Sequence, residues 1–415
     1  MAKLQALVSG MTAAFASLSL LVLTANILAD AGLNFTASYY ALNFAVISGA
    51  LLMLWQNKAI LLMPSVAIAA WLSYIVSISY GVNIYAVLGI SALSSIISML
   101  LAIFGKKFFA KALPKIIKMT IIGAVGIMLV MLSLNLGHII INSAWSVTML
   151  GNFAEPLPYF SVSGIIITLT LMALKIKNAV TIGMVTTAIV TLIEGFWIIP
   201  DAPCLLPEGI DNLAMLTLTA ATDKEIFTLA YTGLALIVTL AAINLANLTA
   251  LRENNNKTLP ISLAASGISA LLGALPLTVS PLSALLSQKN PRYTMLGAII
   301  ILIAALFFEP VIAEIESFPA LTIPVLFITG LMLLKNFTIE LSKYLRVQEL
   351  DLAELVAMTA LLVVMPLGRN ITAGLAIAMV SYVFLSLLAG KKLELTRENY
   401  IFSVVSLIYL LGAYI

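Results

Sequence analysis

Cysteine and histidine are almost absent from the 415-residue chain, which contains one of each, Cys204 and His138. A disulfide framework, an iron–sulfur cluster and a cysteine/histidine zinc site are excluded, because each needs several such ligands. Charge is also scarce: Asp, Glu, Lys and Arg make up 9% of the residues, against roughly a quarter in an ordinary soluble domain. Together with a mean hydropathy of +1.13, this scarcity excludes a soluble enzyme and predicts an integral membrane protein.

Long apolar runs dominate the chain, of which 62% is hydrophobic. Since one helical crossing needs about 20 apolar residues, we expect an all-α polytopic membrane protein with about 14 transmembrane helices. The fourteen runs lie near residues 11–29, 37–56, 59–78, 83–104, 115–141, 159–174, 178–199, 226–250, 258–275, 277–288, 294–313, 320–338, 352–367 and 371–389. A further run at 399–414 leaves two alternatives open, a fifteenth span or a helix lying against the bundle.

The placement of basic residues favours a cytoplasmic N-terminus. If each of the fourteen runs crosses once, 19 of the 21 Lys and Arg residues fall in the inside loops, and only Lys224 and Arg369 lie outside. This asymmetry agrees with the positive-inside rule. The densest cluster of inside charges comprises Lys106, Lys107, Lys111, Lys115 and Lys118.

Two interrupted spans point to an internal repeat. Pro64 in the third run and Pro276 at the tenth lie 212 positions apart (276 − 64), and Pro114 and Pro319 lie 205 apart (319 − 114), close to half the chain. Two halves of seven spans have opposite topology, which is the inverted repeat of many secondary transporters. Interrupted backbone at membrane depth must line protein or a polar cavity, so it marks a candidate solute site. The alternative is that the prolines merely kink two ordinary helices.

Several segments then carry a resemblance to a known family. They read NILADAG at 26–32, LMPSVAIAAW at 62–71, LPKIIKMTIIGAVGI at 113–127, LGNFAEP at 150–156, ALFFEPV at 305–311 and MPLGRNITAGLAIAMVSYVF at 365–384. In this order along nearly the whole chain, they resemble the xanthine/uracil permease superfamily, with the AzgA-like hypoxanthine, guanine and adenine permeases as the nearest branch. The resemblance implies two inverted repeats of seven spans, with short strands in spans 3 and 10 meeting at the solute.

The same resemblance implies a division into a core domain and a gate domain. The core domain would comprise spans 1–4 and 8–11, and the gate domain spans 5–7 and 12–14. In this chain the core corresponds to residues 1–105 and 226–315 and the gate to residues 106–200 and 319–390, followed by the hydrophobic segment 399–415.

Departures from the family pattern concern its acidic residues. The third span keeps Pro64 but lacks the glycines and the asparagine of the usual motif. Span eight, which includes Thr239 and Asn244, has no carboxylate, and Leu282 stands where span ten of the superfamily usually has glutamate. Both carboxylates that the family would use to hold a base and couple protons are missing.

The remaining polar groups suit a neutral planar solute, which needs a few convergent donors and acceptors in an apolar pocket. The resemblance and the broken segments together give these candidate substrate-binding residues: Ala69, Ala70, Thr239, Asn244, Asn247, Thr278 and Ser280. The alternatives are interhelical hydrogen bonding for the asparagines and bonding to the residue's own helix for Ser and Thr. Trp71 and Tyr74 offer stacking rings or plain packing surfaces.

Glu194 is the carboxylate that lies well inside an apolar run. An ionisable group within a span is a functional candidate, so Glu194 is a candidate for coupling or gating, although it lies near the outer end of span seven. Asp30 and His138 are expected at the membrane interface. No phosphate-binding glycine-rich loop precedes a Lys and a hydroxyl residue, so ATP-driven pumping is not expected.

The leading hypothesis is a secondary transporter, not an enzyme, that moves a nucleobase or similar small planar solute across a bacterial cytoplasmic membrane. Its partners would be the solute, membrane lipid, a coupling ion and a second copy in a homodimer, with no nucleic acid, cofactor or metal. Two alternatives remain: the same fold carrying a small anion, and a sensor or partner subunit that does not transport.

Overall fold

The computed structural model describes most of the chain, including all candidate site residues. The described residues are 2–104, 108–143, 148–207, 216–217, 222–253, 255–316, 318–393 and 395–412. Lys106 and Lys107 of the predicted basic cluster, and residues 413–415 of the C-terminal segment, lie outside these ranges.

The first half of the chain forms a series of apolar helices interrupted by one short strand. Its first elements are α1 (Ala2–Asp30), α2 (Phe35–Trp55), β1 (Leu62–Pro64), α3 (Val66–Ala70), the π-helical η1 (Trp71–Ser79), α4 (Ile84–Phe104) and α5 (Phe108–Ala112). They are followed by α6 (Lys115–Leu136), β2 (Ile140–Ile141), β3 (Met149–Leu150), α7 (Pro156–Ala173) and α8 (Ala179–Ile193).

The second half repeats this order, with a strand again in its third segment. It contains α9 (Asp223–Ala250), α10 (Asn255–Leu271), β4 (Leu277–Val279), the 3-10 helix η3 (Pro281–Leu285), α11 (Pro291–Phe307) and α12 (Glu309–Glu316). The chain ends with η4 (Pro319–Leu321), α13 (Thr322–Leu345), α14 (Leu352–Leu367), α15 (Ile371–Leu388) and α16 (Arg397–Gly412).

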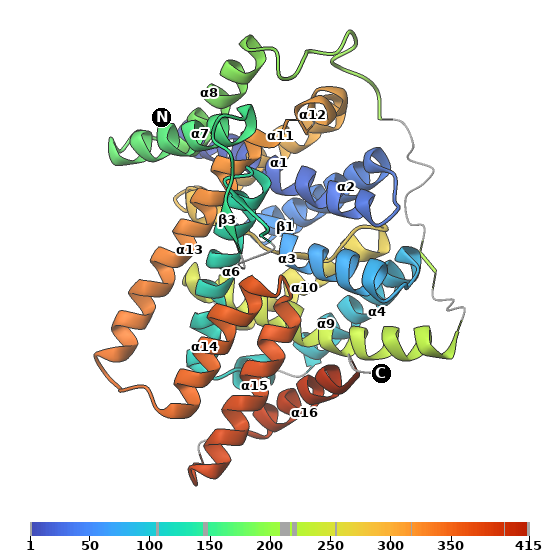
Figure 1. Ribbon diagram of the computed structural model, residues 1–415, viewed down its shortest axis with the longest axis vertical. Coiled ribbons are helices and arrows are strands. Elements are labelled where there is room, and N and C mark those ends of the chain that lie inside the picture. Colours follow the sequence, from blue (N-terminus) through green and yellow to red (C-terminus); the bar gives the residue numbers. More distant parts are fainter. Residues whose placement is uncertain are drawn as a thin grey trace.

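Helix packing follows the same pattern in both halves. The first helix of each half packs against the fourth segment of the other half, α1 against α11 and α9 against α4. The last two long helices of each repeat pack together, α7 against α8 and α14 against α15, and α6 packs against α13 between the halves. In Figure 1, β1 and α3 lie in the middle of the molecule, with α2 and α4 to one side and α6 and α13 to the other. The predicted two-repeat helical fold is confirmed.

The third and tenth predicted runs contain short strands, as expected. The strands begin at Leu62 and Leu277, an offset of 215 positions (277 − 62). Pro64 is the last residue of β1, whereas Pro276 comes just before β4, so the two prolines are not equivalent positions of the repeat. The repeat is carried by the strands and by Ser65 and Ser280, which occupy the N-cap position of the short helix after each strand. Of the two, Ser280 makes a side-chain capping bond, accepting the Leu282 N–H.

Two predicted runs differ from the helices observed. The run 115–141 ends as a helix at Leu136, and its last residues form β2, which pairs with β3. The run 294–313 breaks after Phe307, and the following helix α12 turns away by 83°. Pro310 explains this break, because proline has no N–H with which α11 could continue its hydrogen-bond ladder, whereas it is tolerated in the first turn of α12.

The described residues form eight helices that are long and apolar enough to cross a membrane, or nine if α11 and α12 count as one broken span. Shorter apolar helices occupy residues 66–79, 179–193 and 352–367. Each of the fourteen predicted runs contains a helix or an interrupted segment, while the exact number of crossings stays a prediction.

The C-terminal helix α16 runs along the bundle and packs against α15, α9 and α5. Near its first turn, the Asn399 side-chain amide donates to the Ala112 carbonyl oxygen at 2.8 Å, beside the start of α6. Near its last turn, Asn370 at the start of α15 donates to the Tyr409 hydroxyl at 3.1 Å. Since α15 ends near the point where α16 begins, the two helices run antiparallel from one end of the bundle to the other.

Candidate functional site

A two-stranded antiparallel sheet pairs β1 with β4. Its register places three pairs of residues opposite each other: Leu62 with Val279, Met63 with Thr278, and Pro64 with Leu277. The Ser280 N–H donates to the Leu61 carbonyl oxygen at 2.9 Å. Because hydrogen-bonded pairs alternate in an antiparallel ladder, Pro64 falls at a position that donates nothing to β4, where a proline is tolerated.

Two asparagines of α9 satisfy the outer edge of β4. Asn244 Oδ1 accepts the Val279 N–H at 3.0 Å, and Asn247 Nδ2 donates to the Val279 carbonyl oxygen at 2.7 Å. The amide nitrogen of Asn244 donates to the Leu240 carbonyl oxygen at 2.9 Å. The side chain of Asn244 is therefore fully engaged by the protein and fully buried, while Asn247 also lines a cavity.

Serines of α10 and η3 form hydrogen bonds with further backbone groups of the two interrupted segments. The hydroxyls of Ser266 and Ser269 donate to the carbonyl oxygens of Leu277 and Leu275. Ser283 Oγ accepts the Leu61 N–H at 3.0 Å. These serines were not among the predicted site residues, although the spacing of Ser262, Ser266 and Ser269 along one face of α10 is a signal for them.

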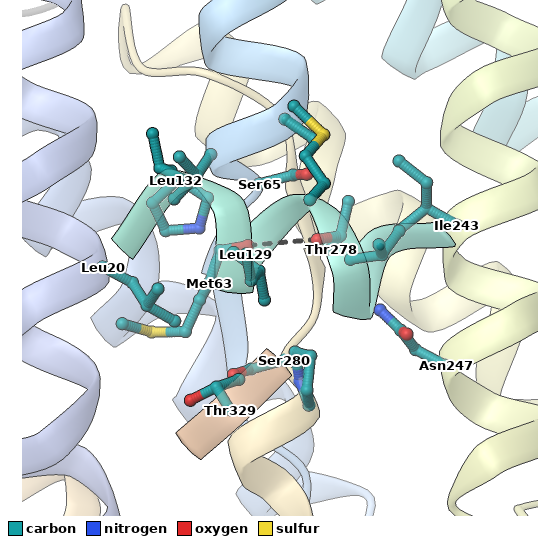
Figure 2. Close-up of a pocket in the computed structure, with 16 residues that line it drawn as sticks. Leu20, Met63, Ser65, Leu129, Leu132, Ile243, Asn247, Thr278, Ser280 and Thr329 are labelled. Atoms are coloured by element: carbon teal, nitrogen blue, oxygen red, sulfur yellow. Dashed lines mark hydrogen bonds between the residues drawn. The ribbon is translucent and has the colours of Figure 1, made fainter. Parts of the chain in front are cut away.

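A small cavity, here called the central cavity, lies where the two strands end and has a volume of about 40 Å³. Its polar lining comes from Ser65, Asn247, Thr278, Ser280 and Thr329, and Figure 2 shows these groups converging from different elements. Solute pockets usually have about 300–1,000 Å³, so the cavity as it stands admits only water-sized molecules. Apolar side chains of α6 close it: Val125, Met128, Leu129 and Leu132.

Two hydroxyls of the central cavity, those of Thr278 and Ser280, hold long hydrogen bonds. Thr278 Oγ1 donates to the Met63 carbonyl oxygen at 3.4 Å, the long contact drawn in Figure 2. Ser280 Oγ accepts the Leu282 N–H at 3.3 Å. Oδ1 of Asn247 makes no hydrogen bond within the described part of the chain. Breaking these long hydrogen bonds costs little free energy. Thr278, Ser280 and Asn247 Oδ1 can therefore bond to a solute instead.

Of the seven predicted substrate-binding residues, the structure brings Asn247, Thr278 and Ser280 together at the central cavity. Ala69 is buried within α3, and Asn244 supports β4. Ala70 lines a second, larger cavity.

The other two candidates lie away from the central cavity. Thr239 Oγ1 lies 3.2 Å from Thr372 Oγ1 and borders a water-sized gap of about 10 Å³ between α9, α15 and α16. Glu194 is exposed at the end of α8 and lines neither this gap nor the two cavities.

The larger cavity, here called the vestibule, has a volume of about 740 Å³. It lies at the ends of α6 and α14 and beside the β2–β3 hairpin. Its polar lining comprises Tyr74, Asn135, His138, Asn142, Thr148 and Arg369. Tyr74 also donates to Asp30 Oδ2 at 2.7 Å, whereas Trp71 is fully buried against the Tyr409 ring, with 5.9 Å between centroids.

Three apolar side chains separate the vestibule from the central cavity. Val66 of α3 and Met128 and Leu132 of α6 line both spaces. A displacement of α6 away from α3 would join the two spaces into one passage. We call these three residues the apolar barrier.

Neither cavity has a carboxylate among the described residues of its lining. Leu282, at the position where the superfamily usually has glutamate, is fully buried in η3. Within the same ranges, no group of three or more His, Cys, Asp or Glu side chains could hold a metal ion. The linings can therefore bind a solute by hydroxyls, amides, peptide groups, one imidazole and one guanidinium.

The sequence of the chain is similar to those of curated permeases. No family model matches the chain. It is 26% identical over 433 residues to the guanine/hypoxanthine permease PbuO of Bacillus subtilis, covering 98% of this chain and 96% of the relative. It is 24% identical over 332 residues to the guanine/hypoxanthine permease PbuG of the same organism, covering 76% and 73%.

Solved structures share the fold at low sequence identity. The transmembrane domain of the cyanobacterial bicarbonate transporter BicA superposes with a TM-score of 0.57 at 14% identity, covering 89% of this chain and 97% of the other. This likeness shows that 89% of the chain shares the fold of that domain. Since similarity to permeases extends over almost its full length, the chain is an integral membrane protein related in sequence to guanine/hypoxanthine permeases, which is consistent with the xanthine/uracil permease family.

Proposed function

We propose that the protein is a permease that moves a nucleobase across the bacterial cytoplasmic membrane, with its N-terminus in the cytoplasm. The observation that carries the proposal is the convergence of Asn247, Thr278 and Ser280 at the ends of two strands. A planar base needs such a small set of donors and acceptors between apolar walls. The names of the similar permeases support a base as the solute.

Movement of the solute would depend on two domains. We assign α1–α4 and α9–α12 to a core and α6–α8 and α13–α15 to a gate, because the apolar barrier joins Val66 of the first group to Met128 and Leu132 of the second. In the proposed orientation the vestibule opens to the outside. The base would pass from it into an expanded central cavity when α6 moves relative to α3.

Uptake in proteoliposomes tests this function. We expect labelled hypoxanthine or guanine to accumulate, and Thr278→Val to raise the KM for the base about tenfold, since a hydroxyl at the solute is lost without a change of shape. Thr170→Val is the matched control, because Thr170 is exposed on α7 and bonds only to its own helix. Absence of base uptake by the wild-type protein would contradict the proposal.

A small anion is the second candidate, because the cavity linings contain Arg369 and no carboxylate within the described residues. The same vesicles should then take up labelled bicarbonate or sulfate, and an excess of these anions should inhibit base uptake. A base that binds without being taken up would instead favour a sensor that does not transport.

A homodimer and a coupling ion complete the proposal. Helices α7 and α8 of the proposed gate expose apolar side chains such as Ile166, Leu169 and Ile189, which either lipid or a second copy would cover. A detergent-corrected mass of two chains at high protein concentration would support the dimer. Hydroxyl and carbonyl oxygens near the strands suit an ion such as sodium, so base uptake should then depend on sodium.

A further inference from the structure

The vestibule has one formally charged side chain among the described residues of its lining, that of Arg369. Its volume of about 740 Å³ is sufficient for a base. Beyond the apolar barrier the central cavity has no charged residue. A solute on its way to the strands therefore meets the guanidinium before any other charge on the described walls.

Among the described residues, no carboxylate forms an ion pair with this guanidinium. The ion pairs found there join Lys58 with Glu253, Lys343 with Glu340 and Lys391 with Asp351. Asp30, on the same side of the molecule as Arg369, accepts the Tyr74 hydroxyl at 2.7 Å. Arg369 lies within electrostatic reach of that hydroxyl without pairing with Asp30.

The backbone of Arg369 is held in place from both sides. It follows α14 with a φ of 47°, a left-handed conformation that glycine usually supplies at a helix end. The next residue, Asn370, caps α15 by accepting the Ala373 N–H at 2.9 Å and donates to Tyr409 of α16 at 3.1 Å. A long charged side chain thus projects from a well-anchored turn.

The guanidinium presents two parallel N–H groups in a fixed plane. The O6 and N7 atoms of a 6-oxopurine are two adjacent acceptors that match this pair, as arginine matches guanine in nucleic-acid recognition. A 6-aminopurine has a donor in place of O6 and can accept only one of the two bonds. Lysine, a point charge without the planar fork, cannot make the paired contact.

We propose that the vestibule is a first binding site for the solute, in which Arg369 selects 6-oxopurines over 6-aminopurines. This inference rests on the proposed function, because it presumes that a base is carried. It adds a second recognition site, separated from the central cavity by Val66, Met128 and Leu132. Selection at this site precedes passage of the apolar barrier.

The test compares selectivity in proteoliposomes at one fixed pH. Labelled hypoxanthine uptake is measured with unlabelled adenine as competitor, for the wild type, Arg369→Gln, Arg369→Lys and Lys224→Gln. We expect Arg369→Gln to raise the KM for hypoxanthine about tenfold, the lower part of the range for one paired base contact, and to change the inhibition constant of adenine less than twofold. The KM of Arg369→Lys for hypoxanthine should lie between those of the wild type and Arg369→Gln. Lys224 is exposed near the start of α9 and lines neither cavity, so both constants of Lys224→Gln should match those of the wild type.

Each outcome decides the matter. An unchanged ratio of hypoxanthine to adenine affinity in Arg369→Gln, with uptake intact, overturns the inference and leaves the proposed function standing. Equal weakening of both bases also overturns it, since the guanidinium would then act only as a general charge. If the wild type carries no base, the proposed function fails first, and if Arg369→Gln is unfolded in detergent, the ratio in Arg369→Lys decides.

Discussion

At the scale of single residues, the peptide groups of Val279 show how a strand is accommodated inside an apolar bundle. A two-stranded sheet leaves the outer edge of each strand without partners, and an unpaired buried peptide group costs about 1–3 kcal/mol. Asn244 and Asn247 supply the missing acceptor and donor from α9. Polar side chains that sequence alone assigns to a solute can therefore serve the backbone that shapes the site.

The first prediction concerns Asn244. Replacement by alanine should lower the free energy of unfolding by about 1–3 kcal/mol, because the Val279 N–H loses its acceptor in a buried site. Thermal unfolding in detergent measures the effect. Thr359→Ala, which removes an exposed hydroxyl bonded only within α14, is the control and should leave the transition where it is.

The second prediction concerns Glu194, the candidate for coupling or gating. Its side chain is exposed at the end of α8 and lines neither the vestibule nor the central cavity. We therefore expect Glu194→Gln to retain base uptake within about twofold, a change of less than 1 kcal/mol. Loss of uptake by this variant in a well-folded preparation would restore the carboxylate as a coupling group.

At the scale of elements, glycines bring helices of the two repeats into close contact. A Cβ atom at Gly297 of α11 would lie 2.1 Å from the Leu7 carbonyl oxygen of α1, and one at Gly10 would lie 1.8 Å from the Thr294 carbonyl oxygen. Gly126 and Gly330 meet in the same way where α6 crosses α13. Small residues at such crossings allow the backbones to approach within the membrane.

The third prediction uses one of these crossings. Gly297→Ala should destabilise the protein by about 1–3 kcal/mol, since the new methyl group meets backbone that cannot give way. Gly267→Ala is the matched control, because its Cβ would have only an ordinary contact of 3.8 Å with Ile96. Yield of folded protein and the midpoint of thermal unfolding separate the two variants; equal stability would contradict the close crossing.

The fourth prediction concerns α16. Its 16 residues give a length of about 24 Å, and its contacts run from Ala112 to Asn370 at opposite ends of the bundle. We expect it to be a fifteenth crossing that places the C-terminus on the side of the membrane opposite Lys392.

Labelling with an impermeant maleimide tests this topology in a Cys204→Ser background. A cysteine appended after residue 415 should react in intact cells, and Lys392→Cys, in the turn between α15 and α16, only after permeabilisation. The same behaviour of both cysteines would show that α16 does not cross. The native Cys204, which is exposed, marks the outer side in the proposed orientation.

At the scale of the whole molecule, the two cavities and the apolar barrier describe a passage that is closed at its centre. One imidazole, that of His138, lies on the described linings, in the vestibule. It does not line the central cavity. The described lining of the central cavity therefore offers a solute between the strands no acidic or basic side chain.

The fifth prediction follows from this arrangement. Uptake of hypoxanthine should not be driven by an imposed inward proton gradient, because no carboxylate lines the described walls of either cavity. The comparison is the accumulation ratio with and without the gradient, in the wild type and in His138→Gln. Strong proton-driven accumulation that persists in His138→Gln would show that another group has taken over the role of the absent carboxylates.

Much of the architecture follows from the sequence alone. Hydropathy and the scarcity of charge determined the membrane class and placed all fourteen runs, because a span must be apolar along its whole length. The interrupted segments around Pro64 and Pro276 indicated the position of the strands. Of the candidate site residues at the central cavity, Thr278 and Ser280 could be proposed because they lie in one of those segments, whereas Asn247 was proposed from the resemblance of span eight.

Tertiary structure alone decided which groups face one another. The strand register, the turn after Phe307 and the burial of Asn244 against Val279 depend on contacts between segments that are distant in the sequence. Local composition cannot tell a hydroxyl or amide that binds a solute from one that satisfies a neighbouring backbone, because both lie in apolar surroundings. Arg369 is one of two basic residues on the predicted outer side, and only the fold brings it to the wall of the vestibule.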